Sequence, residues 1–235
     1  MFFFDPVHLI FALPGLLLAM WARFRLNRTF NKYSKVSTSR GMTGAQVARS
    51  LLDAYGLHHV KVEGVPGQLT DHYDPRSHTL RLSEATYSSP SVAAAGVAAH
   101  EMGHALQHAE NYAPLTLRGA MVPATNFGNN LGPWIVMGGL LLSSFVNSAL
   151  GIMVAWLGVG LFGLAVLFSI VTLPVEFDAS RRAKKLLHSE GILFQDELQG
   201  VDKVLDAAAL TYVAAAISAI GTMLYYVFIL LGRRD

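Results

Sequence analysis

The sequence feature that most constrains the fold is a long apolar run, Leu131 to Leu173, which contains no Asp, Glu, Lys or Arg. As one helix it would measure roughly 65 Å at 1.5 Å per residue, about twice the roughly 30 Å of a bilayer's hydrocarbon core. The run must therefore fold back. Asn147, Ser148 and Gly151 near its middle are typical of a turn, so we predict two membrane spans of about 20 residues joined by a short loop.

Two further apolar runs predict two more spans. One extends from Phe2 to Ala22 and the other from Ala207 to Leu231, each about the length that a membrane helix requires. The first is also compatible with a secretory signal, but its apolar part is long and no A-x-A-like cleavage site follows, which favours an anchor. The composition, 52% hydrophobic and 14% charged with a mean hydropathy of +0.39, agrees with four spans.

The distribution of basic residues predicts the orientation of these spans. Lys and Arg cluster after the first and third spans, which by the positive-inside rule places these segments in the cytoplasm, near anionic lipid, and both termini outside. The formal net charge of +2 is too small to indicate a nucleic acid partner, and without cysteine the chain has no disulfides or thiolate metal sites. The clusters are Arg23, Arg25, Arg28, Lys32, Lys35 and Arg40, then Arg181, Arg182, Lys184 and Lys185.

The segment between the first and second spans predicts a small α+β domain. Thr43 to Gln46 resembles a capping box, and the helix that it begins should end near Gly56. Three strand-like segments, residues 60–62, 68–73 and 79–83, predict a short antiparallel sheet. The last of them is a candidate to pair its backbone with an extended substrate.

An Ala-rich helix follows the predicted sheet. Ser89 and Pro90 are a natural start for it, and it should run from Ser91 to about His108. Because prolines interrupt the weak helical signals that follow, we expect residues 112–130 to form an irregular approach to the membrane. Beyond the third span, a helix should run through Leu187 and stop at Gly191.

The Ala-rich helix contains the segment His100-Glu101-Met102-Gly103-His104, which matches H-E-x-x-H. Histidines four residues apart project from one face of a helix, so both imidazoles can bind one metal ion. Neutral imidazole suits Zn²⁺, and Glu101 beside them can accept a proton from a zinc-bound water that attacks a carbonyl. The alternative is two surface histidines on an amphipathic helix, but such a motif arises by chance only about once in a hundred chains of this composition.

A catalytic zinc needs a third protein ligand. His108 continues the spacing of four but lies about 12 Å along the helix from His100, too far to share one ion. Glu176 and Asp178 directly follow the third span, and two membrane crossings return the chain to the side on which His104 lies. The residues alone leave both carboxylates open as ligands.

The chain resembles the YugP-like family of small membrane-bound neutral zinc metallopeptidases and, in pattern, the HtpX-type membrane proteases. The likeness covers nearly the whole chain through HEMGHALQH, the hairpin from His72 to Arg76, the order of spans and the segment VEFDASRRA. It implies a zincin-like core with one catalytic Zn²⁺ held by His100, His104 and Glu176, with Glu101 as the general base. Ser180 stands where HtpX-type proteins have an aspartate, so we expect altered support behind the ligands.

These inferences give an α+β membrane protein with four transmembrane helices and a small zincin-like catalytic domain that combines the HExxH helix with a short antiparallel sheet. The predicted segments are transmembrane helix 1 (1–22), the catalytic domain (23–130), a transmembrane hairpin (131–173), a helical segment that carries the third ligand (174–206), and transmembrane helix 4 with a short tail (207–235).

We therefore expect a multi-pass protein of the bacterial cell membrane that hydrolyses peptide bonds near the cytoplasmic face, with a polypeptide or an exposed segment of a membrane protein as substrate. The sequence does not predict the oligomeric state. Its candidates for stabilising the oxyanion are Tyr87, Arg181, Arg182 and His188, and none of them is selected.

Three other functions are weighed against this one. A non-catalytic zinc-containing scaffold or chaperone-like binder would not need Glu101, because a structural metal site uses no base. A transporter would carry ionisable groups inside the spans, and spans two to four have no Asp, Glu, Lys or Arg. An intramembrane protease would place its metal helix within the membrane, whereas this helix follows a polar hairpin.

Overall fold

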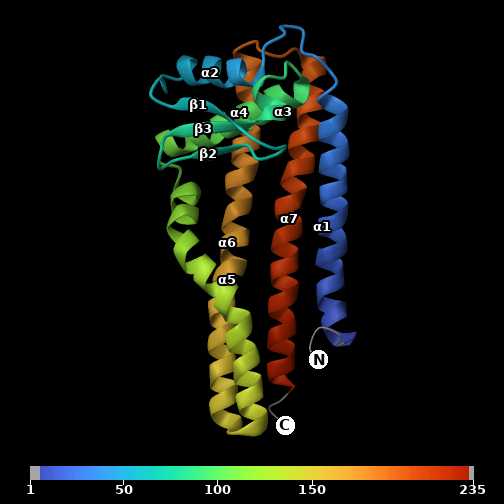
Figure 1. The fold of residues 1–235 in the computed structure, drawn as a ribbon, viewed down its shortest axis with the longest axis vertical. Coiled ribbons are helices and arrows are strands. Elements are labelled where there is room, and N and C mark those ends of the chain that lie inside the picture. Colours follow the sequence, from blue (N-terminus) through green and yellow to red (C-terminus); the bar gives the residue numbers. More distant parts are fainter. Residues whose placement is uncertain (1–5, 233–235) are drawn as a thin grey trace. The chain divides into compact units, whose positions relative to one another are not determined.

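The computed structural model describes residues 6–232, and these are mostly helical with one small sheet (Figure 1). The predicted segments that reach residues 1–5 or 233–235 lie partly outside the described residues. The elements in chain order are α1 (Pro6–Tyr33), α2 (Gly44–Ala54), β1 (Lys61–Val65), β2 (His72–Asp74), β3 (Thr79–Ser83), α3 (Glu84–Tyr87), α4 (Val92–Ala109), α5 (Ala113–Phe145), α6 (Ser148–Ser189) and α7 (Gln195–Leu231).

The chain divides into two compact units, which are described one at a time. Unit 1 takes the beginning of α1, most of α5, the first part of α6 and the end of α7. Unit 2 takes everything else, including the sheet and α2 to α4. In residue numbers, unit 1 is Met1–Trp21, Thr116–Leu173 and Tyr212–Asp235, and unit 2 is Ala22–Leu115 and Pro174–Thr211.

Unit 1 contains the helical hairpin that the long apolar run predicted. Helix α5 ends at Phe145 and α6 begins at Ser148, which confirms the turn expected near Asn147. Glycines let the two helices approach closely, since a Cβ added at Gly139 or Gly158 would collide with the backbone of the opposite helix. Such small residues are typical of helix contacts in membranes. The buried core of the hairpin and α7 consists of Val136, Leu140, Ala155, Val159 and Leu230.

Among the described residues, three helices are long and apolar enough to cross a membrane, namely α1, α6 and α7. Helix α5 contains the remaining predicted span, which is preceded in the helix by Asn129 and Asn130 and includes Pro133. The expected irregular segment before residue 130 is wrong, because α5 is continuous from Ala113 and includes Pro123 and Pro133. Packing against neighbouring helices allows proline inside such helices.

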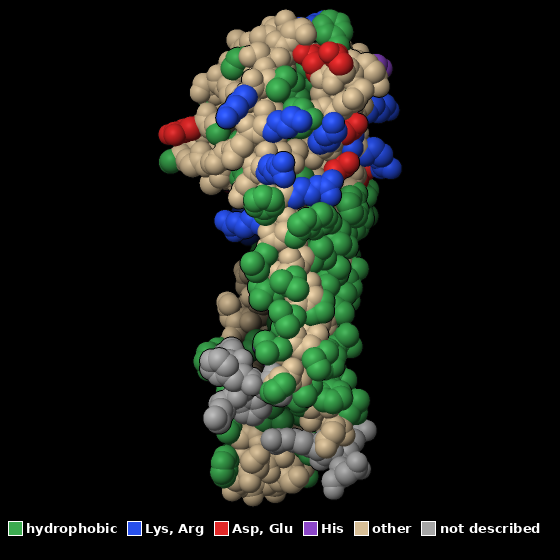
Figure 2. All heavy atoms as spheres, turned by 90° about the vertical axis from the view of Figure 1, so that its right-hand side faces the viewer, with side chains coloured by type: hydrophobic (Ala, Val, Ile, Leu, Met, Phe, Trp, Pro, Cys, Tyr) green, Lys and Arg blue, Asp and Glu red, His purple; other side chains and the backbone are tan. Residues whose placement is uncertain are grey.

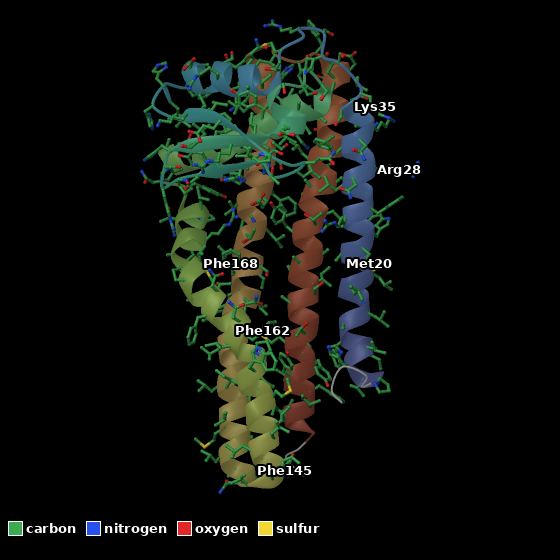
Figure 3. The ribbon with its side chains drawn as sticks, in the orientation of Figure 1. Met20, Arg28, Lys35, Phe145, Phe162 and Phe168 are labelled. Atoms are coloured by element: carbon green, nitrogen blue, oxygen red, sulfur yellow. The ribbon has the colours of Figure 1, made fainter. Side chains whose placement is uncertain are left out.

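The outer surface of unit 1 is apolar. On the face shown in Figure 2, hydrophobic side chains cover its helices. Met20 on α1 is 61% exposed and Phe145 at the tip of the hairpin is 81% exposed (Figure 3). Contiguous apolar surface of this kind is costly in water and suits contact with lipid.

Unit 2 contains a three-stranded sheet in the order β1-β3-β2 (Figure 1). Strand β2 pairs with β3 in an antiparallel hairpin, as predicted, but β1 runs parallel to β3. The expectation of a purely antiparallel sheet is therefore wrong. The reason is that β2 does not pair with β1, the strand before it in the chain. Instead, β3 lies between them, antiparallel to β2 and parallel to β1. Because β3 has a neighbour on each side, its backbone is not available to pair with a substrate.

The core of unit 2 is formed by α2, α4, the sheet, the last part of α6 and the first part of α7. The Thr43 capping box at the start of α2 is present, and α2 buries Val47, Leu51 and Leu52. Helix α4 packs closely on its neighbours because more than half of its first nine residues are alanine, with glycine at position 96. Its N-cap is Ser91, whose hydroxyl accepts a hydrogen bond from the Ala94 N–H, two residues later than the predicted Ser89.

Candidate metal centre

His100 and His104 lie one turn apart on α4, on the same face, as their spacing predicted. Their ring centroids are 4.8 Å apart and the ring planes meet at 86°. Both side chains are only slightly exposed, at 12% each. The buried alanines of α4 fix the helix within unit 2 and so fix the direction in which the two imidazoles point.

Glu176, from the part of α6 in unit 2, faces both histidines. Its Oε2 lies 3.3 Å from His100 Nε2 and 3.6 Å from His104 Nε2, and its side chain is 2% exposed. One ligand atom from each of the three residues lies within 4.8 Å of the others. The residues alone left Glu176 and Asp178 open, and the structure brings Glu176 to the two histidines.

The other ring nitrogen of each histidine has its own partner. His100 Nδ1 is 3.2 Å from Ser180 Oγ, and His104 Nδ1 is 3.0 Å from Gln107 Oε1. Both Nε2 atoms therefore face Glu176. Ser180 occupies the supporting position expected of an aspartate and supplies a neutral hydroxyl there.

Glu101 follows His100 on α4 and is buried, with 7% of its surface exposed. Burial raises the pKa of Glu101 above its ordinary value, and the neighbouring His100 and His104 offset only part of that rise. Burial disfavours a charged His104, but the carboxylates of Glu176 and Glu101 and the hydrogen bond with Gln107 together outweigh it, so the pKa of His104 is raised overall. These four ionisable groups therefore interact with one another at a site that is largely shielded from solvent.

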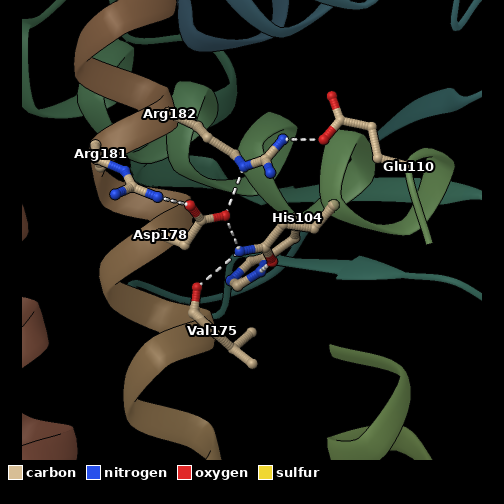
Figure 4. A network of polar contacts seen from close by, with 7 residues as sticks. His104, Glu110, Val175, Asp178, Arg181 and Arg182 are labelled. Carbon is tan, nitrogen blue, oxygen red and sulfur yellow. Dashed lines mark hydrogen bonds and ion pairs between the residues drawn. The ribbon is translucent and has the colours of Figure 1, made fainter. Parts of the chain in front are cut away.

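The remaining sequence candidates lie outside this group. His108 Nδ1 is 3.0 Å from Tyr73 Oη, which agrees with its exclusion as a ligand. Asp178 accepts hydrogen bonds from Gln107, Arg181 and Arg182 (Figure 4). The two arginines that were candidates for the oxyanion are thus bound to Asp178.

The donor set fits zinc. Two imidazoles and one carboxylate from protein are a known ligand set of catalytic zinc, in which the fourth position is kept for water. Here both Nε2 atoms converge on the carboxylate while both Nδ1 atoms are hydrogen-bonded, which is the usual arrangement behind metal-binding histidines. His100, His104 and Glu176 would hold the ion.

Sequence reasoning did not find two residues that shape this centre. Gln107 lies in the quoted HEMGHALQH segment, three residues after His104, which places it one turn farther along the same face of α4. Gly103 separates Met102 from His104 and lets α6 approach α4 closely. The i+3 spacing of Gln107 was a usable signal, whereas the contact at Gly103 depends on tertiary packing.

Comparison with known proteins identifies the family of this chain. A family model described as "Putative neutral zinc metallopeptidase" matches residues 8–231, and the chain belongs to that family of zinc peptidases. It is 50% identical over 218 residues to the protein of Bacillus subtilis (strain 168) named "Putative membrane protease YugP", a match that covers 93% of this chain and 94% of the relative. The family resemblance predicted from the motifs is confirmed. No solved structure matches the chain.

Proposed function

We propose that this protein is a membrane-anchored zinc endopeptidase whose metal is held by His100, His104 and Glu176. The observation that carries the proposal is the convergence of these three side chains within 4.8 Å beside the buried Glu101. A scaffold that merely binds zinc would not require a buried carboxylate next to the ligands.

The proposed chemistry assigns one role to each residue. Bound zinc would polarise the scissile carbonyl and make an attacking water more acidic. Glu101 takes the proton of that water and delivers it to the departing amine, as a general base and then a general acid. The raised pKa of Glu101 that burial produces suits it to hold a proton between these two steps.

The proposal includes a topology. Four membrane crossings, with α5 contributing one of them, would place residues 23–130 and 174–206 together on the cytoplasmic side. This proposal is supported by the basic residues that follow α1's apolar part, among them Arg28 and Lys35 (Figure 3). The substrate would then be a polypeptide or the exposed segment of a membrane protein near the cytoplasmic face.

Metal analysis and proteolysis of the purified full chain test this function. The parent should bind one zinc per chain and cleave an unfolded protein such as reduced casein. Glu101→Gln should keep the zinc and lose cleavage by at least about 100-fold, in the range of general base catalysis, whereas Glu176→Ala should lose both. Cleavage by Glu101→Gln at the parental rate would overturn the assignment, and zinc binding without any cleavage by the parent would favour the scaffold.

A further inference from the structure

We propose that Gln107 is a positioning residue, which fixes the proton of His104 on Nδ1 and so keeps Nε2 free for the metal. The inference rests on the proposed function in one respect, namely that His104 is a zinc ligand. Gln107 is fully buried, yet it belongs to neither the ligand set nor the apolar core.

The orientation of the Gln107 amide follows from its two other partners. Its Nε2 lies 2.9 Å from the Val175 carbonyl oxygen and 2.9 Å from Asp178 Oδ2. Both partners are acceptors, so the nitrogen must face them and both of its hydrogens are used. The amide oxygen is left to face His104 Nδ1 at 3.0 Å.

The amide orientation determines the tautomer of the metal-binding imidazole. A glutamine oxygen only accepts, so His104 Nδ1 must be the donor and carry a hydrogen. A neutral imidazole has one N–H, and with that hydrogen on Nδ1 its Nε2 presents a lone pair. His104 Nε2 is the atom that faces Glu176, so the hydrogen bond selects the nitrogen that can bind zinc.

Asp178 in turn keeps Gln107 in this orientation. Arg181 and Arg182 both donate to the Asp178 carboxylate, and Arg182 also donates to Glu110 at 2.6 Å (Figure 4). Two guanidinium partners hold Asp178 in its charged form, in which it has no hydrogen to donate. The Gln107 amide cannot flip without opposing its oxygen to that carboxylate. A chain of contacts therefore runs from the arginines through Asp178 and Gln107 to His104.

Burial alone does not account for glutamine at this position. An apolar side chain of similar size would avoid the desolvation of an amide at a fully buried position. Glutamine satisfies all three of its polar contacts instead, and each contact has the polarity needed to orient His104. Partners of this kind behind a metal ligand typically change metal affinity by about 10- to 100-fold when removed.

Zinc affinity of the full chain in detergent, measured by competition with a chelator, tests the inference without substrate. Gln107→Met keeps the volume and removes the acceptor, so it should bind zinc about 10- to 100-fold more weakly than the parent. Gln199→Met is the matched control, since Gln199 is an exposed glutamine of the same unit, and it should bind zinc as the parent does. Parental affinity in Gln107→Met would overturn the inference.

A reversed pair separates positioning from general stability. Asp178→Asn introduces an amide that can donate, and Gln107→Glu introduces a carboxylate that can accept both from that amide and from His104. Neither variant can donate to the Val175 carbonyl oxygen as Gln107 does, so the single and double variants differ only at position 178. The double variant should bind zinc at least about 10-fold more tightly than Gln107→Glu alone and give a visible spectrum of bound Co²⁺ closer to that of the parent, because the single variant opposes two carboxylates. If the single and double variants lose the same amount of zinc affinity, the chain of contacts is refuted. This comparison does not depend on Gln107→Met, so it holds even if that variant does not fold. Because no substrate is used, these outcomes stay separate from any failure of peptide hydrolysis.

Discussion

Gly103 of α4 lies directly against the backbone of Ala179 on α6, so that a Cβ added to Gly103 would be 2.7 Å from the Ala179 carbonyl oxygen and 3.2 Å from its Cα. Backbone atoms cannot give way as a flexible side chain can. This contact lies one residue from His104 in the sequence and three residues from Glu176. The distance between the histidine pair and the carboxylate therefore depends on the absence of a side chain at Gly103.

Replacing Gly103 should weaken the metal centre even though Gly103 has no side chain that could bind metal. Gly103→Ala forces α4 and α6 apart, and overpacking of this kind typically costs about 1–3 kcal/mol of stability. The same displacement moves Glu176 away from His100 and His104, so zinc binding should weaken by at least about 10-fold, measured by chelator competition together with a thermal melt. Gly119→Ala on α5 is the control, since no atom lies within 4 Å of the added Cβ. Equal zinc affinity in Gly103→Ala and the parent would contradict this prediction.

Ser180 should support His100 through its hydroxyl. Ser180 is buried and its Oγ lies 3.2 Å from His100 Nδ1, so Ser180→Ala removes the acceptor while leaving the ligand in place. The expected result is zinc affinity about 10- to 100-fold lower than in the parent, with little change in the melting temperature of the metal-free protein. Ser189→Ala, an exposed serine near the end of the same helix, should leave the affinity unchanged. If both alanine variants bind zinc equally, the hydroxyl has no role at the metal.

The sequence predicted the part of the site that depends on local geometry. The spacing of His100 and His104 on one helix is enough to place both rings together, because side chains four apart share a helix face. Glu176 needed the membrane hairpin and a family resemblance to select it over Asp178. Asp178 is an equally plausible ligand by type, and only its contacts with Gln107 and two arginines give it a different role.

The errors arose where contacts between distant residues decide the structure. Strand β3 lies between β1 and β2 and is parallel to β1. The alternation of side chains within a strand does not encode this order of strands. Helix α5 continues through Pro123, a residue that ends most helices in water. By contrast, Ser180 lies 80 residues from His100 in the sequence, and it was the family resemblance rather than a local pattern that placed it behind the ligands, where it contacts His100 Nδ1.

The β2–β3 hairpin should weaken in acid through Asp74. Hydrogen bonds from Ser77 Oγ and the Arg76 N–H lower the pKa of Asp74 from an ordinary 3.8 to about 2. A depressed pKa means that the charged carboxylate stabilises the fold above the ordinary value, and that this stabilisation is lost as the pH falls toward about 2. In thermal melts, the parent should be more stable than Asp74→Asn at about pH 5 and lose that advantage near about pH 2.

The source of this pH dependence can be checked at Ser77. Its hydroxyl donates to Asp74 Oδ2 at 2.7 Å, and this is the largest contribution to the lowered pKa of Asp74. Ser77→Ala should therefore raise the midpoint of the Asp74 carboxyl titration toward its ordinary value, as followed by carbon NMR. A stability difference between the parent and Asp74→Asn that is the same at every pH would refute the role of Asp74.

The proposed topology can be tested by labelling single cysteines. The sequence contains no cysteine of its own, so only an introduced cysteine can react. Asn147 lies in the turn between α5 and α6, and Ser50 is exposed on α2. If both termini and the hairpin turn lie outside while residues 23–130 lie in the cytoplasm, a membrane-impermeant maleimide added to intact cells should label Asn147→Cys and not Ser50→Cys. After permeabilisation it should label both. Labelling of Ser50→Cys but not Asn147→Cys in intact cells would reverse the orientation, and labelling of both there would rule out an odd number of crossings between them.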